Sequence, residues 1–283
     1  MPEHTSWLNF VPGYEALEHA VAALGASWLF GNPVVVQHIA AMLLVSLFIL
    51  LLSLAAHGQL VRAGNDLLPE SKLSARTVVE LLIEGLLSLM QFAMPFEAAM
   101  RHFRLIGTLG AFILFSNLLG LIPGFLPPTE NYNVTFACAS IVFIYYNAYA
   151  LYKLGLGHLT HMANPVGESW GWLLSPLFFP VELISHCIRP ISLSVRLLCN
   201  IAGDHLVLAV FVGLFPLVLP LPFMALGLFV AVVQTFIFLL LSCVYIGEVE
   251  AMVAHHHHAE HAHAAEPTGS HADSARVMMP RAD

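Results

Sequence analysis

The sequence predicts an all-α membrane protein that crosses the bilayer about five times and has one amphipathic helix on its surface. Of its 283 residues, 58% are hydrophobic and only 10% are charged, and the mean hydropathy of +0.80 is well above that of soluble domains. Several apolar segments are long enough to cross a hydrocarbon core of about 30 Å. Lys and Arg occur near the ends of these segments, which predicts their direction across the membrane.

The first predicted span runs from Val34 to Ala56. Basic residues follow it, and because Lys and Arg are enriched on the cytoplasmic side, this loop is expected inside. They are Arg62, Lys72 and Arg76. Residues 1–33 are then an external amino-terminal segment. The first 61 residues contain no Lys or Arg, which argues against a signal peptide and favours a bacterial or organelle-encoded protein.

The segment from Val78 to Met94 is predicted to be an amphipathic helix lying on the inner surface of the membrane. Its polar residues, Glu80, Glu84 and Gln91, share one helical face. The opposite face is a stripe of Leu, Ile and Met, which can enter the apolar edge of the bilayer.

Two further spans are predicted from Leu105 to Ile122 and from Asn133 to Tyr152. Arg101 and Arg104 precede the first of them, and Lys153 follows the second. One outward and one inward crossing place both basic ends on the cytoplasmic side, so charge and geometry agree.

The last two apolar segments, Val181 to Leu214 and Leu221 to Ala254, would each form a helix about 50 Å long, which exceeds the membrane thickness. We therefore expect an antiparallel pair of strongly tilted helices, with a break allowed at Pro190. Residues 34–254 then form the membrane domain. Residues 255–283 are expected to be a histidine-rich, disordered cytoplasmic tail.

Polar residues recur along one face of the Val181 to Leu214 helix. Ionisable groups are costly inside a membrane, so this face is a candidate functional site. Arg196 has no acidic residue three or four positions away, so its countercharge is expected on another chain. Glu182 could instead form a structural pair with His186 or Arg189. The residues on this face are Glu182, His186, Arg189, Arg196, Asn200 and Asp204, and His205 points elsewhere.

Four segments resemble subunit a of the rotary ATP synthases. Pro190–Asn200 resembles the segment with the family's essential arginine, and Gln234–Tyr245 resembles its last helix. Asn117–Pro123 and Pro127–Thr135 resemble its second span and the external loop after it. The matches follow the family's order and together cover most of the chain from Val34 to Tyr245.

The resemblance implies a non-catalytic proton-channel subunit of the bacterial inner membrane, with no cofactor or metal. Its partners would be a ring of c subunits, b-type peripheral stalk subunits and the rest of the ATP synthase complex, without nucleic acid. Arg196 would separate two aqueous half-channels and face the carboxylates of the ring. Asn200 and Gln234 would lie beside Arg196. Glu182, together with His186, would belong to a half-channel.

The relay of the external half-channel has two candidates. The family's register selects His205, whereas a shift of one residue selects Asp204. The family's partner for this group falls at Gly227, which has no side chain that could form the pair.

Two other functions are compatible with parts of the sequence. Seven histidines after Ala254 suggest a divalent metal-ion transporter whose tail gathers metal, although a lone membrane arginine would repel a cation. A membrane scaffold without transport would not need Arg196. The sequence contains no phosphate-binding glycine loop, so ATP chemistry would belong to partner subunits.

Overall fold

The computed structural model describes residues 36–63, 74–122, 124–155, 157, 171–214 and 220–264, and within these ranges it is helical with no strand. The predicted external segment 1–33 and residues 265–283 lie outside the described residues. The elements are α2 (Val36–Ala63), α3 (Ala75–Ala93), α4 (Phe96–Leu119), the short 3₁₀ helix η2 (Pro128–Glu130), α5 (Tyr132–Leu154), α7 (Gly171–Leu214) and α8 (Pro220–Ala264).

The prediction of about five membrane helices is confirmed. Five helices of the described part contain a stretch long and apolar enough to cross a membrane: Val36–Val61, Phe96–Leu119, Tyr132–Leu154, Phe179–Gly213 and Leu221–Ala254. Several of the helices start earlier or end later than the hydrophobic stretches predicted, because a helix already formed is extended at little cost.

The sixth long helix, α3, is the predicted amphipathic one. It begins after Ser74, whose side chain accepts a hydrogen bond from the backbone N–H of Thr77. Leu86 and Met90 are buried while Glu84 is exposed, as expected for a helix with one apolar face. Its placement on the inner membrane surface remains a prediction.

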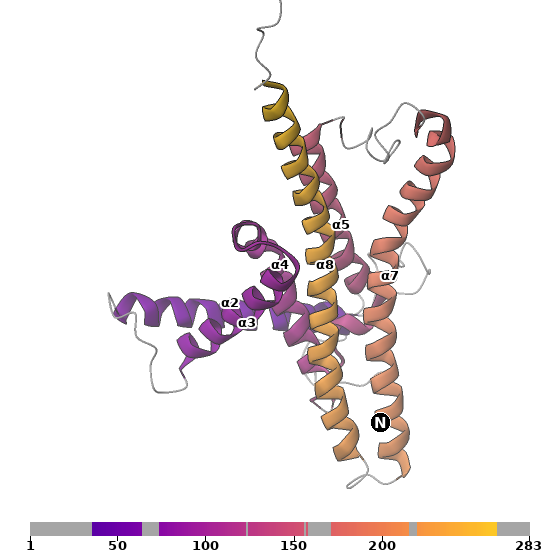
Figure 1. The fold of residues 1–283 in the computed structure, drawn as a ribbon. Helices are drawn as coiled ribbons and strands as arrows, with labels where there is room; N and C mark the ends of the chain where they lie inside the picture. The colour runs from indigo at the N-terminus through magenta and orange to yellow at the C-terminus, as the bar shows by residue number, and fades with distance from the viewer. Residues whose placement is uncertain are drawn as a thin grey trace, which may run out of the picture.

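Helices α7 and α8 are 44 and 45 residues long, or about 65 Å each. Figure 1 shows them antiparallel, side by side over the part next to their connection, with α2 running across their direction. Helices that cross in this way cannot all stand upright in one bilayer. A pair longer than the membrane is thick can cross it obliquely, and the strong tilt of α7 and α8 remains a prediction.

The break considered at Pro190 is absent, because α7 continues through this residue. A proline lacks the N–H that would bond to the carbonyl four residues earlier, but neighbouring helices compensate for such defects in membrane proteins. Pro190 is buried, and Figure 1 shows that α7 bends along its length without interruption.

Helix α8 continues to Ala264 instead of ending near Ala254. The expectation of a disordered tail from residue 255 is therefore wrong for its first part. The added residues are Ala, His and Glu, none of which stops a helix that is already formed.

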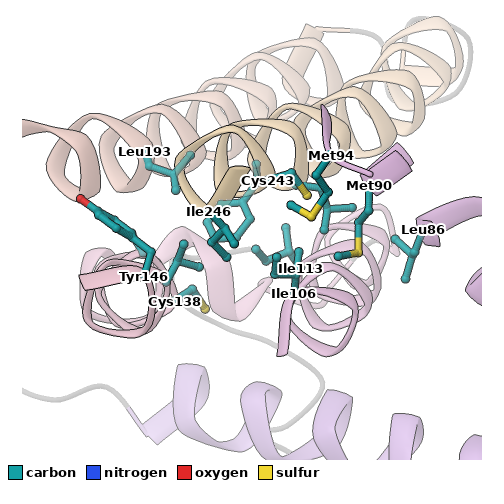
Figure 2. Close-up of a cluster of buried hydrophobic side chains, with 14 of the residues drawn as sticks. Leu86, Met90, Met94, Ile106, Ile113, Cys138, Tyr146, Leu193, Cys243 and Ile246 are labelled. Carbon is teal, nitrogen blue, oxygen red and sulfur yellow. The ribbon is translucent and has the colours of Figure 1, made fainter. Parts of the chain in front are cut away.

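The apolar core is built from α3, α4, α5, α7 and α8. Figure 2 shows Met90 and Ile113 on one side of it, with Tyr146, Leu193 and Ile246 on the other. Among the buried residues of α8, Phe238, Leu239, Cys243 and Ile246 recur at helical spacing. This packing holds α8 beside α7, and the two helices carry the candidate functional site.

Gly110 of α4 packs against Leu239 of α8. A Cβ at this position would lie 2.7 Å from Leu239 Cδ2, whereas a Cβ at Gly58 of α2 would meet no atom within 4 Å. We expect Gly110→Val to destabilise the subunit by about 1–3 kcal/mol, because side chains added to a filled core force their neighbours to move. The measurement is the thermal unfolding midpoint in detergent, with Gly58→Val as the control. Equal losses in the two variants would contradict the prediction.

Candidate functional site

Arg196 lies at the middle of Phe179–Gly213, the apolar stretch of α7. Its side chain is exposed, while Leu193 and Leu197 on the adjoining face are buried in the core. Within the part of the chain that the structure describes, no acid forms an ion pair with Arg196. The guanidinium is thus accessible to a group outside this chain.

Three other arginines of the described residues form ion pairs. Arg76 bonds to Glu80 one turn later at 2.6 Å, Arg101 bonds to Glu250 at 2.9 Å, and Arg189 bonds to Glu248 at 2.9 Å. Acids are therefore placed beside these cations but not beside the arginine at mid-span.

One turn after Arg196, Asn200 contacts α8. Its Nδ2 atom donates a hydrogen bond to Gln234 Oε1 at 2.5 Å. Gln234 is only 1% exposed, and its Nε2 atom has no hydrogen-bond partner among the described residues. A buried donor without a partner is costly, so it marks a place where a water or another chain is expected. The structure thus brings two sequence-predicted residues together within a turn of Arg196.

A small cavity lies on the side of Gln234 toward the connection between α7 and α8. Its volume is about 40 Å³, and about 10–15 Å³ suffices for one water. Its polar side chains come from three helices: Asn117 of α4, Asp204 of α7 and Gln234 of α8. Asp204 is half-buried and contributes the carboxylate of this cavity.

One of the two candidate relays lies at this cavity. Asp204 lines it, whereas the side chain of His205 lies outside the described part of the structure. Gly227 also lines it, and a Cβ there would lie only 3.0 Å from Leu121 Cδ2. A longer side chain at position 227 would thus have to displace Leu121.

A second polar group lies on the opposite side of Arg196 along α7. His186 Nε2 is 3.2 Å from Glu182 Oε1, and its Nδ1 is 3.0 Å from the hydroxyl of Tyr146 on α5. His186 is buried while Glu182 is partly exposed, so the pair connects the interior with the surface. Of the pairings considered for Glu182, the one with His186 is present.

Arg189 was on the predicted polar face, but its partners could not be foreseen. Besides its ion pair with Glu248, its guanidinium lies 4.8 Å from the ring centre of Tyr245, a cation–π distance. Sequence reasoning also missed Asn117 as a cavity residue. Its place in the Asn117–Pro123 match was the available signal.

The rival metal-transporter hypothesis finds no site here. In the ranges described, no group of three or more His, Cys, Asp or Glu side chains could hold a metal ion. The side chains of the histidine-rich end of α8 lie outside the described part of the structure.

Comparison with known proteins shows the family of this chain. The sequence profile of the ATP synthase A chain family matches residues 30–247. ATP synthase subunit a of Sorangium cellulosum (strain So ce56) is 40% identical over 263 residues, which are 90% of this chain and 100% of the relative. Subunit a of Bdellovibrio bacteriovorus is 38% identical over 78% of this chain and 93% of the relative, and that of Geobacter sulfurreducens is 44% identical over 59% and 71%. This chain therefore belongs to the ATP synthase A chain family.

Proposed function

We propose that this subunit conducts protons between two offset half-channels, and that Arg196 separates the half-channels and faces the carboxylates of a rotating ring of c subunits. Membership of the family makes the chain a membrane-sector subunit of an ATP synthase with a part in proton transport. The observation that carries the finer proposal is an arginine at the middle of a membrane helix that is exposed and forms no ion pair with any residue the structure describes.

The exposed side of α7 extends from Arg196 to a stripe of apolar side chains that lies about 110° further around the helix. Four apolar side chains of α7 are 41% to 57% exposed and recur every three or four residues, so they form one stripe: Ile184, Ile188, Ile191 and Val195. Of the five apolar stretches, that of α7 has the smallest buried share. A large uncovered helical face of this kind suits a partner that is itself made of membrane helices.

A ring carboxylate and Arg196 complement each other physically. An ionised carboxylate in hydrocarbon costs several kcal/mol, so a ring site facing lipid must be protonated. Beside Arg196 the same group can ionise, because the guanidinium supplies a countercharge. Arginine stays protonated in proteins and so cannot pass the proton on, which would prevent a direct leak between the half-channels.

The two polar groups on α7 would serve as the two half-channels. The cavity with Asp204 and Asn117 would belong to the external one, with His205 as the alternative relay. Glu182 and His186 would belong to the cytoplasmic one. Asp204 lies eight residues after Arg196 and His186 ten residues before it, about 12 Å and 15 Å along the helix. At these distances, neither residue can pass a proton directly to the other half-channel around Arg196.

The energy for rotation would come from the membrane potential. Each charge that crosses 100 mV releases about 2.3 kcal/mol. We place the subunit in a bacterial inner membrane, with its amino terminus outside and its carboxyl terminus in the cytoplasm, in contact with the c ring and b-type stalk subunits.

A photoreactive amino acid at position 191 tests the contact with the ring. In membranes that contain the whole complex, we expect illumination to cross-link position 191 to a c subunit. Leu47 of α2 is comparably exposed, at 55% against 46% for Ile191, and position 47 is the control that should give no such product. Cross-links from position 191 only to lipid would show that the ring does not cover this side of α7, and would overturn the proposed contact.

A further inference from the structure

The loop between α4 and α5 contains a threonine, Thr129, whose side chain is buried in the membrane domain. Thr129 lies in the 3₁₀ helix η2 and is 0% exposed. Its hydroxyl donates a hydrogen bond to Asn117 Oδ1 at 3.0 Å. The turn is held by backbone bonds from Glu130 to Pro127 and from Asn131 to Pro128, and its prolines restrict the backbone further.

The orientation of the Asn117 amide follows from its neighbours. Its Nδ2 atom lies 3.5 Å from the backbone oxygen of Ala231 on α8. A carbonyl oxygen can only accept, so the NH₂ group must face Ala231 and the amide oxygen must face Thr129. A reversed amide would set two oxygens against each other at Ala231. Ala231 thus selects a single orientation of Asn117, and the Thr129 hydroxyl holds the amide oxygen in that orientation.

Asn117 links this external turn to the candidate site. Asn117 and Ala231 both line the cavity that also contains Asp204 and Gln234. Ala231 lies three residues before Gln234, about one helical turn away. Thr129 itself does not line this cavity, so its influence there passes through the amide of Asn117.

We propose that Thr129 is a positioning residue of the external proton path, which fixes the Asn117 amide so that the cavity presents a constant set of polar groups to water. The inference rests on the proposed function and adds a residue to it. Without the hydroxyl, Asn117 Oδ1 is buried beside an apolar group and loses its donor. The amide then leaves its orientation, and water in the cavity loses an ordered neighbour.

Thr129→Val tests the proposal, because it keeps the branched shape and removes the hydroxyl. In inverted membrane vesicles with the whole complex, we expect the initial rate of ATP-driven proton pumping to fall about three- to tenfold, the range for one lost hydrogen bond. The rate is expressed per assembled complex, so that poorer assembly alone does not lower it. Thr129→Ser, which restores the hydroxyl, should pump within about twofold of the wild type.

Thr135→Val is the matched control. Thr135 is also 0% exposed, but its hydroxyl donates to the backbone oxygen of Tyr132 within α5. We expect its rate per complex to match the wild type. Normal pumping by Thr129→Val, or equal losses in the Ser and Val variants, would overturn the inference. Cross-linking from position 191 in the same variants measures the contact with the ring separately. Loss of that cross-link would contradict the proposed function and not the role of Thr129.

Discussion

Replacing Arg196 by alanine is expected to abolish ATP-driven proton pumping while leaving the amount of subunit in the membrane unchanged. The side chain is exposed and forms no ion pair in the described part of the chain, so its removal leaves no buried partner without a countercharge. The fold should therefore tolerate the change. Ionisation of the ring carboxylate should fail in this variant, because no cation would lie near it.

The expected size of this effect follows from the cost of charge in hydrocarbon. An uncompensated carboxylate costs several kcal/mol, and each 1.4 kcal/mol is a factor of about ten in rate, so a loss of at least about a hundredfold is expected. The measurement is acidification of inverted vesicles after ATP addition. Arg104→Ala is the matched control, since Arg104 is also exposed and unpaired among described residues but lies near the start of α4. Pumping by Arg196→Ala above about a tenth of the wild-type rate would contradict the proposed role.

The membrane helices could be predicted from the sequence because the bilayer leaves few alternatives. Backbone groups in hydrocarbon must bond within their own segment, so an apolar run of sufficient length has to be helical. Helix ends were less predictable. Hydropathy locates the most apolar stretch, whereas α4 starts at Phe96, before the predicted Leu105, and α8 ends at Ala264, after the predicted Ala254. Pro190 was misjudged for a related reason, since tertiary packing decides whether a proline interrupts a membrane helix.

The candidate site was predictable only along α7. Helical periodicity shows which residues share a face, and it grouped Glu182 with His186 and Arg196 with Asn200. It cannot show which helix lies opposite. The pairing of Arg189 with Glu248 joins residues 59 positions apart, and the bond of Asn117 to Ala231 joins residues 114 apart. Such contacts depend on how the helices pack, and no local pattern encodes them.

The largest expected effect on stability comes from Glu250, which joins α8 to α4 and α5. Its Oε1 atom accepts hydrogen bonds from Arg101 at 2.9 Å, His102 at 2.9 Å and Tyr149 at 2.8 Å. His102 is 1% exposed, and its other ring nitrogen lies 2.8 Å from the hydroxyl of Tyr145. A carboxylate can only accept, so His102 Nε2 must hold a proton. One carboxylate thus satisfies donors from two other helices.

Glu250→Ala should destabilise the subunit by about 3 kcal/mol, because it leaves the fully buried His102 without its partner, whereas solvent can replace the partner of the half-exposed Arg101. Glu250→Gln keeps an oxygen acceptor and should lose less. Glu248→Ala is the informative control, since it breaks the α7–α8 ion pair with a side chain that is 46% exposed, where solvent replaces the lost partner. Thermal unfolding in detergent should rank the variants as Glu250→Ala below Glu250→Gln, with Glu248→Ala nearest the wild type. If Glu248→Ala unfolds at or below the temperature of Glu250→Ala, the anchor of α8 lies at α7 and not at α4 and α5.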